Sequence, residues 1–316
     1  MILNLVFLIV GFVILIKGAD IFVDGASAVA GNFKVSKMLI GLTIVAFGTS
    51  APELAVSIKS LISGSGDMVL GNVIGSNILN ILLILGLSAM FHSLAVKNNT
   101  VKKELPITLM ITTAFAVLLS DSIFTKSVTN SFTRGDGIVL LLFFSVFMYY
   151  LISMSRNKID EDSKDNYPSM KKACLLTVLG LIGIVVGSNF VVDGASGLAK
   201  IVGISERMIS LTIVAIGTSL PELVTSVAAT RKGEYDIAIG NVVGSNIFNI
   251  GIVIGIPVAI FGGISKINFS YIDIVVMILS ALFLFIFSYN DHKISKKEGI
   301  FFLLAFIAYY SYVIFG

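Results

Sequence analysis

The sequence predicts an all-α polytopic membrane protein with ten transmembrane helices, arranged as two inverted repeats of five helices each. Three observations lead to this prediction: the composition, an internal repeat, and the spacing of the apolar segments. The chain has 316 residues, of which 56% are hydrophobic and 13% are charged, about half the charged fraction of a typical soluble domain. Apolar stretches long enough to cross a bilayer recur along the whole length.

The two halves of the sequence resemble each other closely. With a shift of 169 residues, residues 18–86 align with residues 187–255 without a gap, and 33 of the 69 pairs are identical. Two motifs recur at this distance: Gly-Thr-Ser-x-Pro-Glu at 48–53 and 217–222, and Gly-Asn-Val-x-Gly-Ser-Asn-Ile-x-Asn-Ile at 71–81 and 240–250. Two homologous halves in a membrane chain are typical of transporters that bind their substrate at the interface between the halves.

Five segments of each half are predicted to cross the membrane. They are residues 3–23, 38–62, 68–90, 107–119 and 135–153, followed by 173–192, 208–230, 237–261, 271–289 and 300–314. The polar residues between them form a linker, which divides the chain into a first repeat (1–153), a linker loop (154–171) and a second repeat (172–316). Because five is an odd number, the second repeat enters the membrane from the opposite side, and the repeats are therefore expected to be inverted.

The basic residues predict the orientation of the chain. The loops on the side of the linker carry fifteen Lys and Arg residues, whereas those on the other side carry six. Positively charged loops stay inside the cell. We therefore expect the linker in the cytoplasm and both termini outside a cell membrane.

Glu53 and Glu222 lie in the middle of two apolar segments. A carboxylate at this depth costs several kcal/mol unless a partner compensates it, and neither segment has Lys or Arg in its central part. Each glutamate follows a proline, which removes a helical hydrogen bond and releases the carbonyl four residues back. Carboxylates beside released carbonyls predict a cation site.

The third segment of each half adds polar oxygens at matching places. Ser76 and Asn80 are four residues apart, as are Ser245 and Asn249, so each pair shares one face of a helix. Packing between helices is the alternative role for such residues, since glycines accompany them. Carboxylate, hydroxyl, amide and carbonyl oxygens together favour hard cations such as calcium and sodium over zinc or copper.

These repeated motifs resemble the paired alpha repeats of the sodium/calcium exchanger family, within the cation/calcium exchanger superfamily, and the absence of a large insertion resembles its prokaryotic members. The resemblance covers nearly the whole chain. It implies that Glu53 and Glu222 are the central calcium ligands, together with the carbonyls of Thr49 and Thr218. It further implies flanking sodium sites, formed by Ser50, Ser76, Ser219, Ser245 and the carbonyls of Ala46 and Ala215. Two more residues, Asn80 and Asn249, are implied to border the centre.

The expected function is secondary active exchange of sodium for calcium by alternating access. Potassium-dependent relatives carry Asp where this chain has Asn249, so potassium is expected to be dispensable. A calcium/proton antiporter, or an antiporter of another divalent cation, is the alternative, and a passive cation channel is a further one. The prediction includes no enzymatic activity, no cofactor, no nucleic acid and no protein partner; calcium, sodium and the lipid bilayer are the expected partners.

Overall fold

The first half of the chain folds almost entirely into helices. A computed structural model describes residues 1–124, 129–156, 167–203, 215–267 and 270–315. Helical turns with π geometry are labelled η. The elements of the first half are α1 (Ile2–Phe33), α2 (Lys37–Ile40), η1 (Gly41–Val45), α3 (Ala46–Thr49), α4 (Ala51–Ile62), α5 (Gly66–Leu79), η2 (Asn80–Leu85), α6 (Gly86–Phe91), β1 (Leu94–Ala95), η3 (Thr100–Glu104), α7 (Leu105–Leu118), α8 (Asp121–Phe124), β2 (Asn130–Phe132) and α9 (Arg134–Arg156).

The second half is also mainly helical where it is described. Its elements are α10 (Met170–Ile201), α12 (Ala215–Thr218), α13 (Leu220–Arg231), α14 (Tyr235–Phe248), η5 (Asn249–Ile254), α15 (Gly255–Phe261), β3 (Ile264–Ile267), α16 (Tyr271–Asp291), β4 (Lys293–Ile294) and α17 (Lys296–Phe315).

Seven helices in the described part of the chain are long and apolar enough to cross a membrane. An eighth is obtained if the bent pair Lys37–Thr49 and Ala51–Ile62 is one span. Of the other two predicted spans, 107–119 corresponds to α7 with η3 before it, and 208–230 begins outside the described residues. The chain is therefore a multi-pass helical protein, whereas the count of ten spans stays a prediction.

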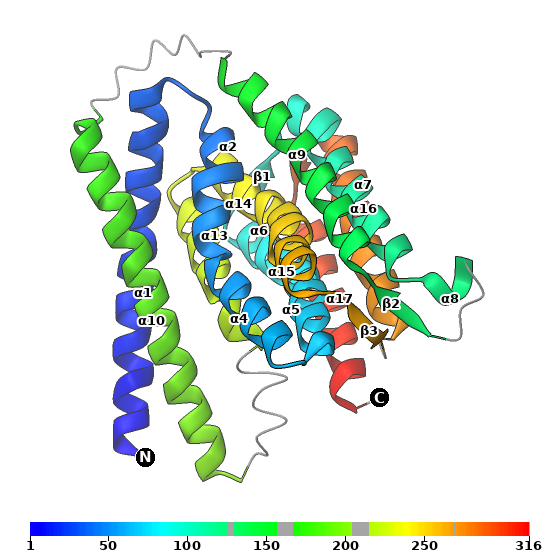
Figure 1. Cartoon of the computed structure of the whole chain (residues 1–316). Helices are drawn as coiled ribbons and strands as arrows, with labels where there is room; N and C mark the ends of the chain where they lie inside the picture. The colour runs from blue at the N-terminus through cyan, green and yellow to red at the C-terminus, as the bar shows by residue number, and fades with distance from the viewer. Residues whose placement is uncertain (125–128, 157–166, 204–214, 268–269, 316) are drawn as a thin grey trace.

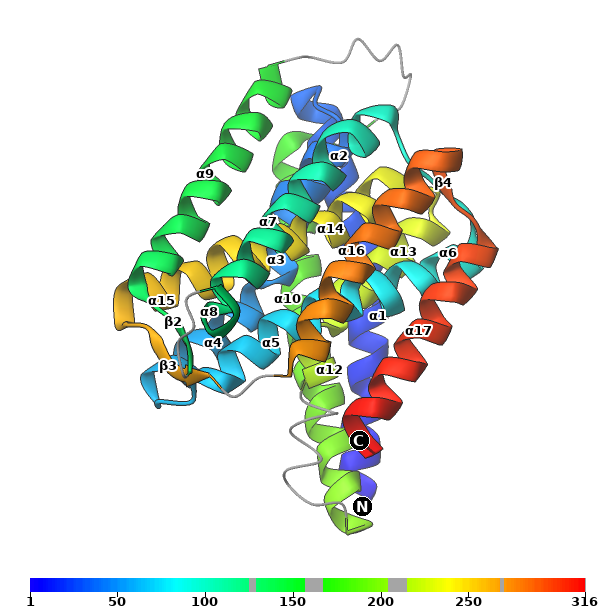
Figure 2. The same ribbon diagram turned by 90° about the vertical axis from the view of Figure 1, so that its right-hand side faces the viewer.

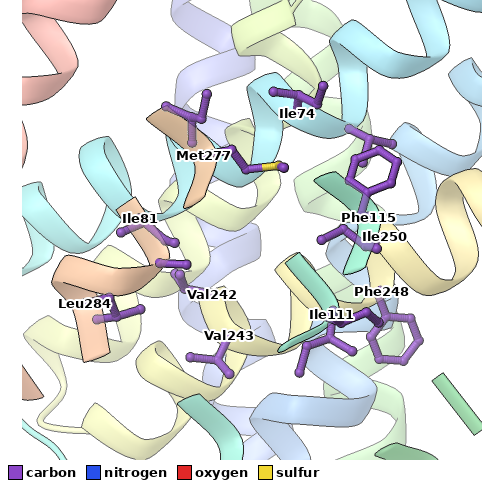
Figure 3. Close-up of a cluster of buried hydrophobic side chains, with 14 of the residues drawn as sticks. Ile74, Ile81, Ile111, Phe115, Val242, Val243, Phe248, Ile250, Met277 and Leu284 are labelled. Carbon is purple, nitrogen blue, oxygen red and sulfur yellow. The ribbon is translucent and has the colours of Figure 1, made fainter. Parts of the chain in front are cut away.

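Two long central helices form the core. One runs through α5, η2 and α6, and the other through α14, η5 and α15. Apolar side chains of these helices pack against α7 and α16, as Figure 3 shows for Ile74, Ile81, Val242, Val243, Phe248, Ile250, Ile111, Phe115, Met277 and Leu284. The outer helices instead expose apolar side chains such as Leu142, Leu179 and Leu304. This distribution is typical of a protein with lipid around it.

Helices α1 and α10 run side by side in opposite directions (Figure 1). Glycines let their backbones touch: a Cβ atom on Gly18 would lie 2.7 Å from the backbone nitrogen of Ile184, and one on Gly187 would lie 2.5 Å from that of Leu15. Such close approach through small residues is a common way to pack helices in membranes. Gly18 lies beside Ile184, and its equivalent Gly187 lies beside Leu15. This register shows that α1 and α10, the first helices of the two halves, are antiparallel.

Four short strands, which the sequence did not predict, connect the halves. β1 pairs with β4 with Leu94 opposite Ile294, and β2 pairs with β3 with Phe132 opposite Ile264, both antiparallel. Both chain termini lie at one end of the molecule, while the last turn of α9 and the first turn of α10 lie at the other (Figures 1 and 2).

Candidate functional site

Glu53 and Glu222 are both buried, each with 1% of its surface exposed. Each lies in the first turn of a helix, α4 or α13, that begins after a break at Ser50 or Ser219. The proline at the second position of each helix explains the break, because it cannot donate to the preceding turn. At Ser50 the two parts of the chain are bent by 44°.

The serines at the two breaks pair crosswise with the glutamates. The Ser50 hydroxyl donates to Glu222 Oε1 at 3.0 Å. The Ser219 hydroxyl lies 3.3 Å from Glu53 Oε1 and 3.1 Å from Ser76 Oγ, and either can accept its proton. Ser245 Oγ lies 3.5 Å from Glu222 Oε1. These contacts form two groups of three residues, one around Glu222 with Ser50 and Ser245 and one around Ser219 with Glu53 and Ser76. In each group the serine at the break of one half meets the glutamate of the other half.

Among the described residues, the second oxygen of each carboxylate has no hydrogen-bond partner. Glu53 Oε2 and Glu222 Oε2 are buried and unpaired, and so are the side-chain oxygens of Asn80 and Asn249. All four atoms are acceptors, and they come from equivalent positions of the two halves. A buried acceptor without a donor is unfavourable, and a bound cation is the kind of group that such oxygens coordinate.

No basic side chain neutralises the two carboxylates in the part of the chain that the structure describes. The ion pairs found there involve Glu234, Asp236 and Asp24 instead. Among the same residues no group of three His, Cys, Asp or Glu side chains could hold a metal ion. A cation at this site would therefore take its oxygens from two carboxylates together with hydroxyls, amides and carbonyls, a set suited to calcium or sodium.

Asn72 and Asn241 donate hydrogen bonds to the backbone of the glutamates, and the sequence did not predict them as site residues. Asn72 Nδ2 donates to the carbonyl of Glu53 at 3.1 Å and to Ser57 Oγ at 3.0 Å. Asn241 makes the equivalent bonds to the Glu222 carbonyl at 3.3 Å and to Ser226 Oγ at 2.9 Å. The signal was present in the repeated Gly-Asn-Val of both halves, because an intramembrane asparagine needs partners.

The remaining predicted residues lie in the turns before the breaks. Thr49 donates its hydroxyl towards the carbonyls of Val45 and Ala46 and towards Asn241 Oδ1 at 3.0 Å. The Ala46 carbonyl also accepts from the Ser50 backbone at 3.0 Å. Ala215 and Thr218 begin and end α12, the equivalent turn of the second half.

The carbonyl of Gly217, which Pro221 releases, accepts a hydrogen bond from a side chain. Ser188 of α10 donates to the Gly217 carbonyl at 3.0 Å. The equivalent residue in the first half is Ala19, which has no hydroxyl. The two halves of the site are therefore similar in sequence but differ in this contact.

A cavity of about 450 Å³ lies against the site between α4, α10 and α12. It is lined by residues that include Pro52, Val56, Ser188, Asn189, Val192 and Thr218. From the site, α4 leads towards the end of the molecule that carries the termini (Figures 1 and 2).

Comparisons with known proteins agree with each other. The profile of the family described as sodium/calcium exchanger protein matches residues 3–153 and 172–315. CaxA, a candidate antiporter from Alkalimonas amylolytica, is 38% identical, and the alignment covers 100% of both chains. The sodium/calcium exchanger MaX1 of Methanosarcina acetivorans is 34% identical, with 97% of each chain covered. A solved structure of the sodium-calcium exchanger NCX_Mj superposes with a TM-score of 0.85 at 34% identity, covering 98% of each chain.

Proposed function

Because this chain belongs to the sodium/calcium exchanger family, we propose that it exchanges sodium for calcium as a secondary active antiporter that needs no potassium. The observation that carries this proposal is the set of four buried acceptor oxygens without donors, on Glu53, Glu222, Asn80 and Asn249. Two carboxylates balance one calcium ion, and the amide oxygens add ligands without adding charge. The absence of a third carboxylate at Asn249 supports independence from potassium.

In this proposal ten of the twelve predicted residues divide between one central and several flanking sites, and Asn80 and Asn249 border the centre. Calcium binds between Glu53 and Glu222, with the carbonyls of Thr49 and Thr218. Sodium ions bind beside it, next to the hydroxyl oxygens that now pair with the carboxylates and the carbonyls of the preceding turns. The residues of the flanking sites are Ser50, Ser76, Ser219, Ser245, Ala46 and Ala215.

Alternating access follows from two inverted repeats that meet at the site. The antiparallel course of the equivalent helices α1 and α10 supports the inversion. The cavity between α4 and α10, lined by Pro52 and Thr218, supports access of ions to the site, and both termini lie at one end of the molecule. We assign that end to the outside of the cell and the linker to the cytoplasm, as the distribution of Lys and Arg favours.

Calcium uptake by purified protein in liposomes tests the proposal. With sodium inside and calcium-45 outside, we expect uptake that stops when choline replaces the internal sodium. Replacing potassium by choline, with sodium held fixed, should leave uptake unchanged. Uptake driven by a proton gradient without sodium would instead indicate a calcium/proton antiporter. Uptake that needs no gradient of a second ion would indicate a channel.

A further inference from the structure

Four asparagines form a network where the two central helices cross, and two of them have no place in the cation site proposed above. We propose that Asn77 and Asn246 are positioning residues, which fix the side-chain amides of Asn80 and Asn249 so that their oxygens face the cation. The inference rests on the proposed function of the site and concerns how its amide ligands are oriented.

The network joins the two halves crosswise. Asn80 Nδ2 donates to Asn246 Oδ1 at 2.9 Å, and Asn249 Nδ2 donates to Asn77 Oδ1 at 3.1 Å. The amide nitrogens of Asn77 and Asn246 each donate, at 3.4 Å, to the backbone carbonyl of the other. All four side chains are buried, with at most 2% exposed.

Hydrogen-bond chemistry leaves one orientation for every amide in this network. A backbone carbonyl can only accept, so Asn77 and Asn246 must present their NH₂ groups to each other's backbone. Their side-chain oxygens then face Asn249 and Asn80. These two residues must in turn present NH₂ groups, which leaves their own oxygens pointing away from the network. Within the described part of the chain, those two oxygens have no hydrogen-bond partner.

The orientation matters because an amide is a dipole. With its oxygen towards the site, Asn80 offers a cation a ligand; turned by half a rotation, it would present an NH₂ group and repel the cation. Asn80 follows Ser76 by one turn, and Ser76 lies in the chain of contacts that leads through Ser219 to Glu53. The first residues of the π-helical turns η2 and η5 are Asn80 and Asn249, and such turns are frequent at functional sites.

A substitution at Asn246 separates positioning from simple packing. Asn246→Leu removes the acceptor that holds the Asn80 amide, whereas Asn246→Asp keeps an acceptor there. We expect Asn246→Leu to raise the calcium concentration for half-maximal exchange roughly ten- to a hundredfold, because the Asn80 oxygen would no longer be held towards the cation and a polar contact to a charged group is lost. Asn246→Asp should retain the affinity or increase it. Equal losses in both variants would contradict the proposal.

A double-mutant cycle with Asn80→Asp is the sharper test. A carboxylate presents an oxygen whichever way it turns, so it needs no orienting partner. In the Asn80→Asp background, Asn246→Leu should therefore change calcium affinity by less than about threefold. A role in helix packing alone predicts the same loss in both backgrounds, and that result would overturn the inference.

The equivalent pair, Asn77 and Asn249, provides a second test in case a variant of Asn246 does not fold. Asn77→Leu, alone and in the Asn249→Asp background, tests the equivalent contact of the other half. Calcium binding to each purified variant in detergent, measured by titration calorimetry, is read beside exchange. Wild-type protein that binds calcium but does not exchange it for sodium would refute the proposed function alone. Asn246→Leu and Asn77→Leu variants that fold and bind calcium as wild type does would refute the positioning role alone.

Discussion

At the scale of single residues, the site depends on two carboxylates that have no basic partner in the described part of the chain. Their pairing with serines is crosswise, so neither half contains a complete site. Each glutamate keeps one buried oxygen free of hydrogen bonds. A protein that held these charges only for stability would be expected to pair them, because an uncompensated buried charge is strongly destabilising.

We expect Glu53→Gln and Glu222→Gln each to abolish sodium-dependent calcium uptake while the protein stays folded. Loss of one carboxylate removes about 3–5 kcal/mol of interaction with a buried cation, which exceeds a hundredfold in affinity. Calcium-45 uptake into liposomes measures the effect, and melting in detergent without calcium measures the fold.

Glu104→Gln is the matched control for these variants. Glu104 is also fully buried with one unpaired oxygen, but its other oxygen accepts from Tyr150, away from the two groups of serines and glutamates. Uptake should survive in this variant. If Glu53→Gln transports as well as Glu104→Gln does, the assignment of the site is wrong.

The sequence alone pointed to the glutamates and serines because charged and polar residues are conspicuous in apolar segments and recur in the repeat. It did not reveal which serine meets which glutamate, since Ser50 and Glu222 are 172 residues apart and meet only through the packing of the two halves. Asn77 and Asn246 were overlooked for a related reason: their partners are asparagines of the other half.

At the scale of secondary-structure elements, helix ends and helix geometry depart most from the prediction. The apolar segment 3–23 became the 32-residue helix α1, because small residues such as Ala26 and Ala30 extend its buried face beyond Asp24. The π-helical turns at Asn80 and Asn249 have no sequence signature of their own. They depend on contacts between helices, which a single sequence does not display.

The packing of α1 against α10 gives a prediction for this scale. We expect Gly18→Ala to destabilise the protein by about 1–3 kcal/mol, the usual cost of overpacking. Its Cβ would lie 2.7 Å from a backbone atom of α10, and backbone cannot move aside as a side chain can. Thermal melting in detergent measures the change.

Gly75→Ala provides the comparison, because nothing lies within 4 Å of a Cβ atom at that helical position. Alanine is also the better helix former. We therefore expect an unchanged or higher melting temperature. Equal destabilisation by the two substitutions would show that backbone contact between α1 and α10 is not the cause.

Ion pairs join α1 and the start of α2 to the turn between α13 and α14. Lys232 Nζ lies 2.6 Å from Asp24 Oδ1, and Lys37 Nζ lies 2.8 Å from Glu234 Oε1, which also accepts from Ser27. The repeat does not reproduce these charges. In the equivalent turn between α4 and α5, Ser63 and Ser65 take the places of Lys232 and Glu234. The two halves therefore differ in the charges of this turn.

Replacing Lys232 by serine, the residue of the equivalent position, should loosen the last turns of α1. Asp24 is well exposed, so its ion pair contributes only about 0–1 kcal/mol. We expect hydrogen exchange of the backbone of residues 24–33 to become a few times faster at low salt. Lys59→Ser, which removes an exposed lysine from α4, serves as the control. Unchanged exchange in Lys232→Ser would show that this ion pair does not hold α1.

At the scale of the whole molecule, the internal repeat was the strongest sequence signal, because it predicted that one site would draw equally on both halves. The paired contacts of Asn72 and Asn241, and of Asn80 and Asn249, follow that symmetry. The described structure breaks it at Ser188 and at Lys232. These differences lie in contacts of other residues and not in the predicted ligands themselves.

The charge of the site predicts how the whole carrier responds to voltage. Glu53 and Glu222 give the site a charge of −2 when both are ionised, because Asn80 and Asn249 are neutral. One calcium ion brings the charge to zero. Three sodium ions, the number implied by the resemblance to sodium/calcium exchangers, bring it to +1. The sodium-loaded carrier would then feel about 2.3 kcal/mol per 100 mV if its charge crossed the whole potential.

We therefore expect exchange to be electrogenic, with sodium entry and calcium exit accelerated by an inside-negative potential. Recording from reconstituted protein on a solid-supported membrane should show a transient current when calcium is exchanged for sodium. A potassium diffusion potential set with valinomycin should change the exchange rate in liposomes. Two sodium ions would leave both loaded forms neutral, so exchange without current and without an effect of the potential would contradict the count of three.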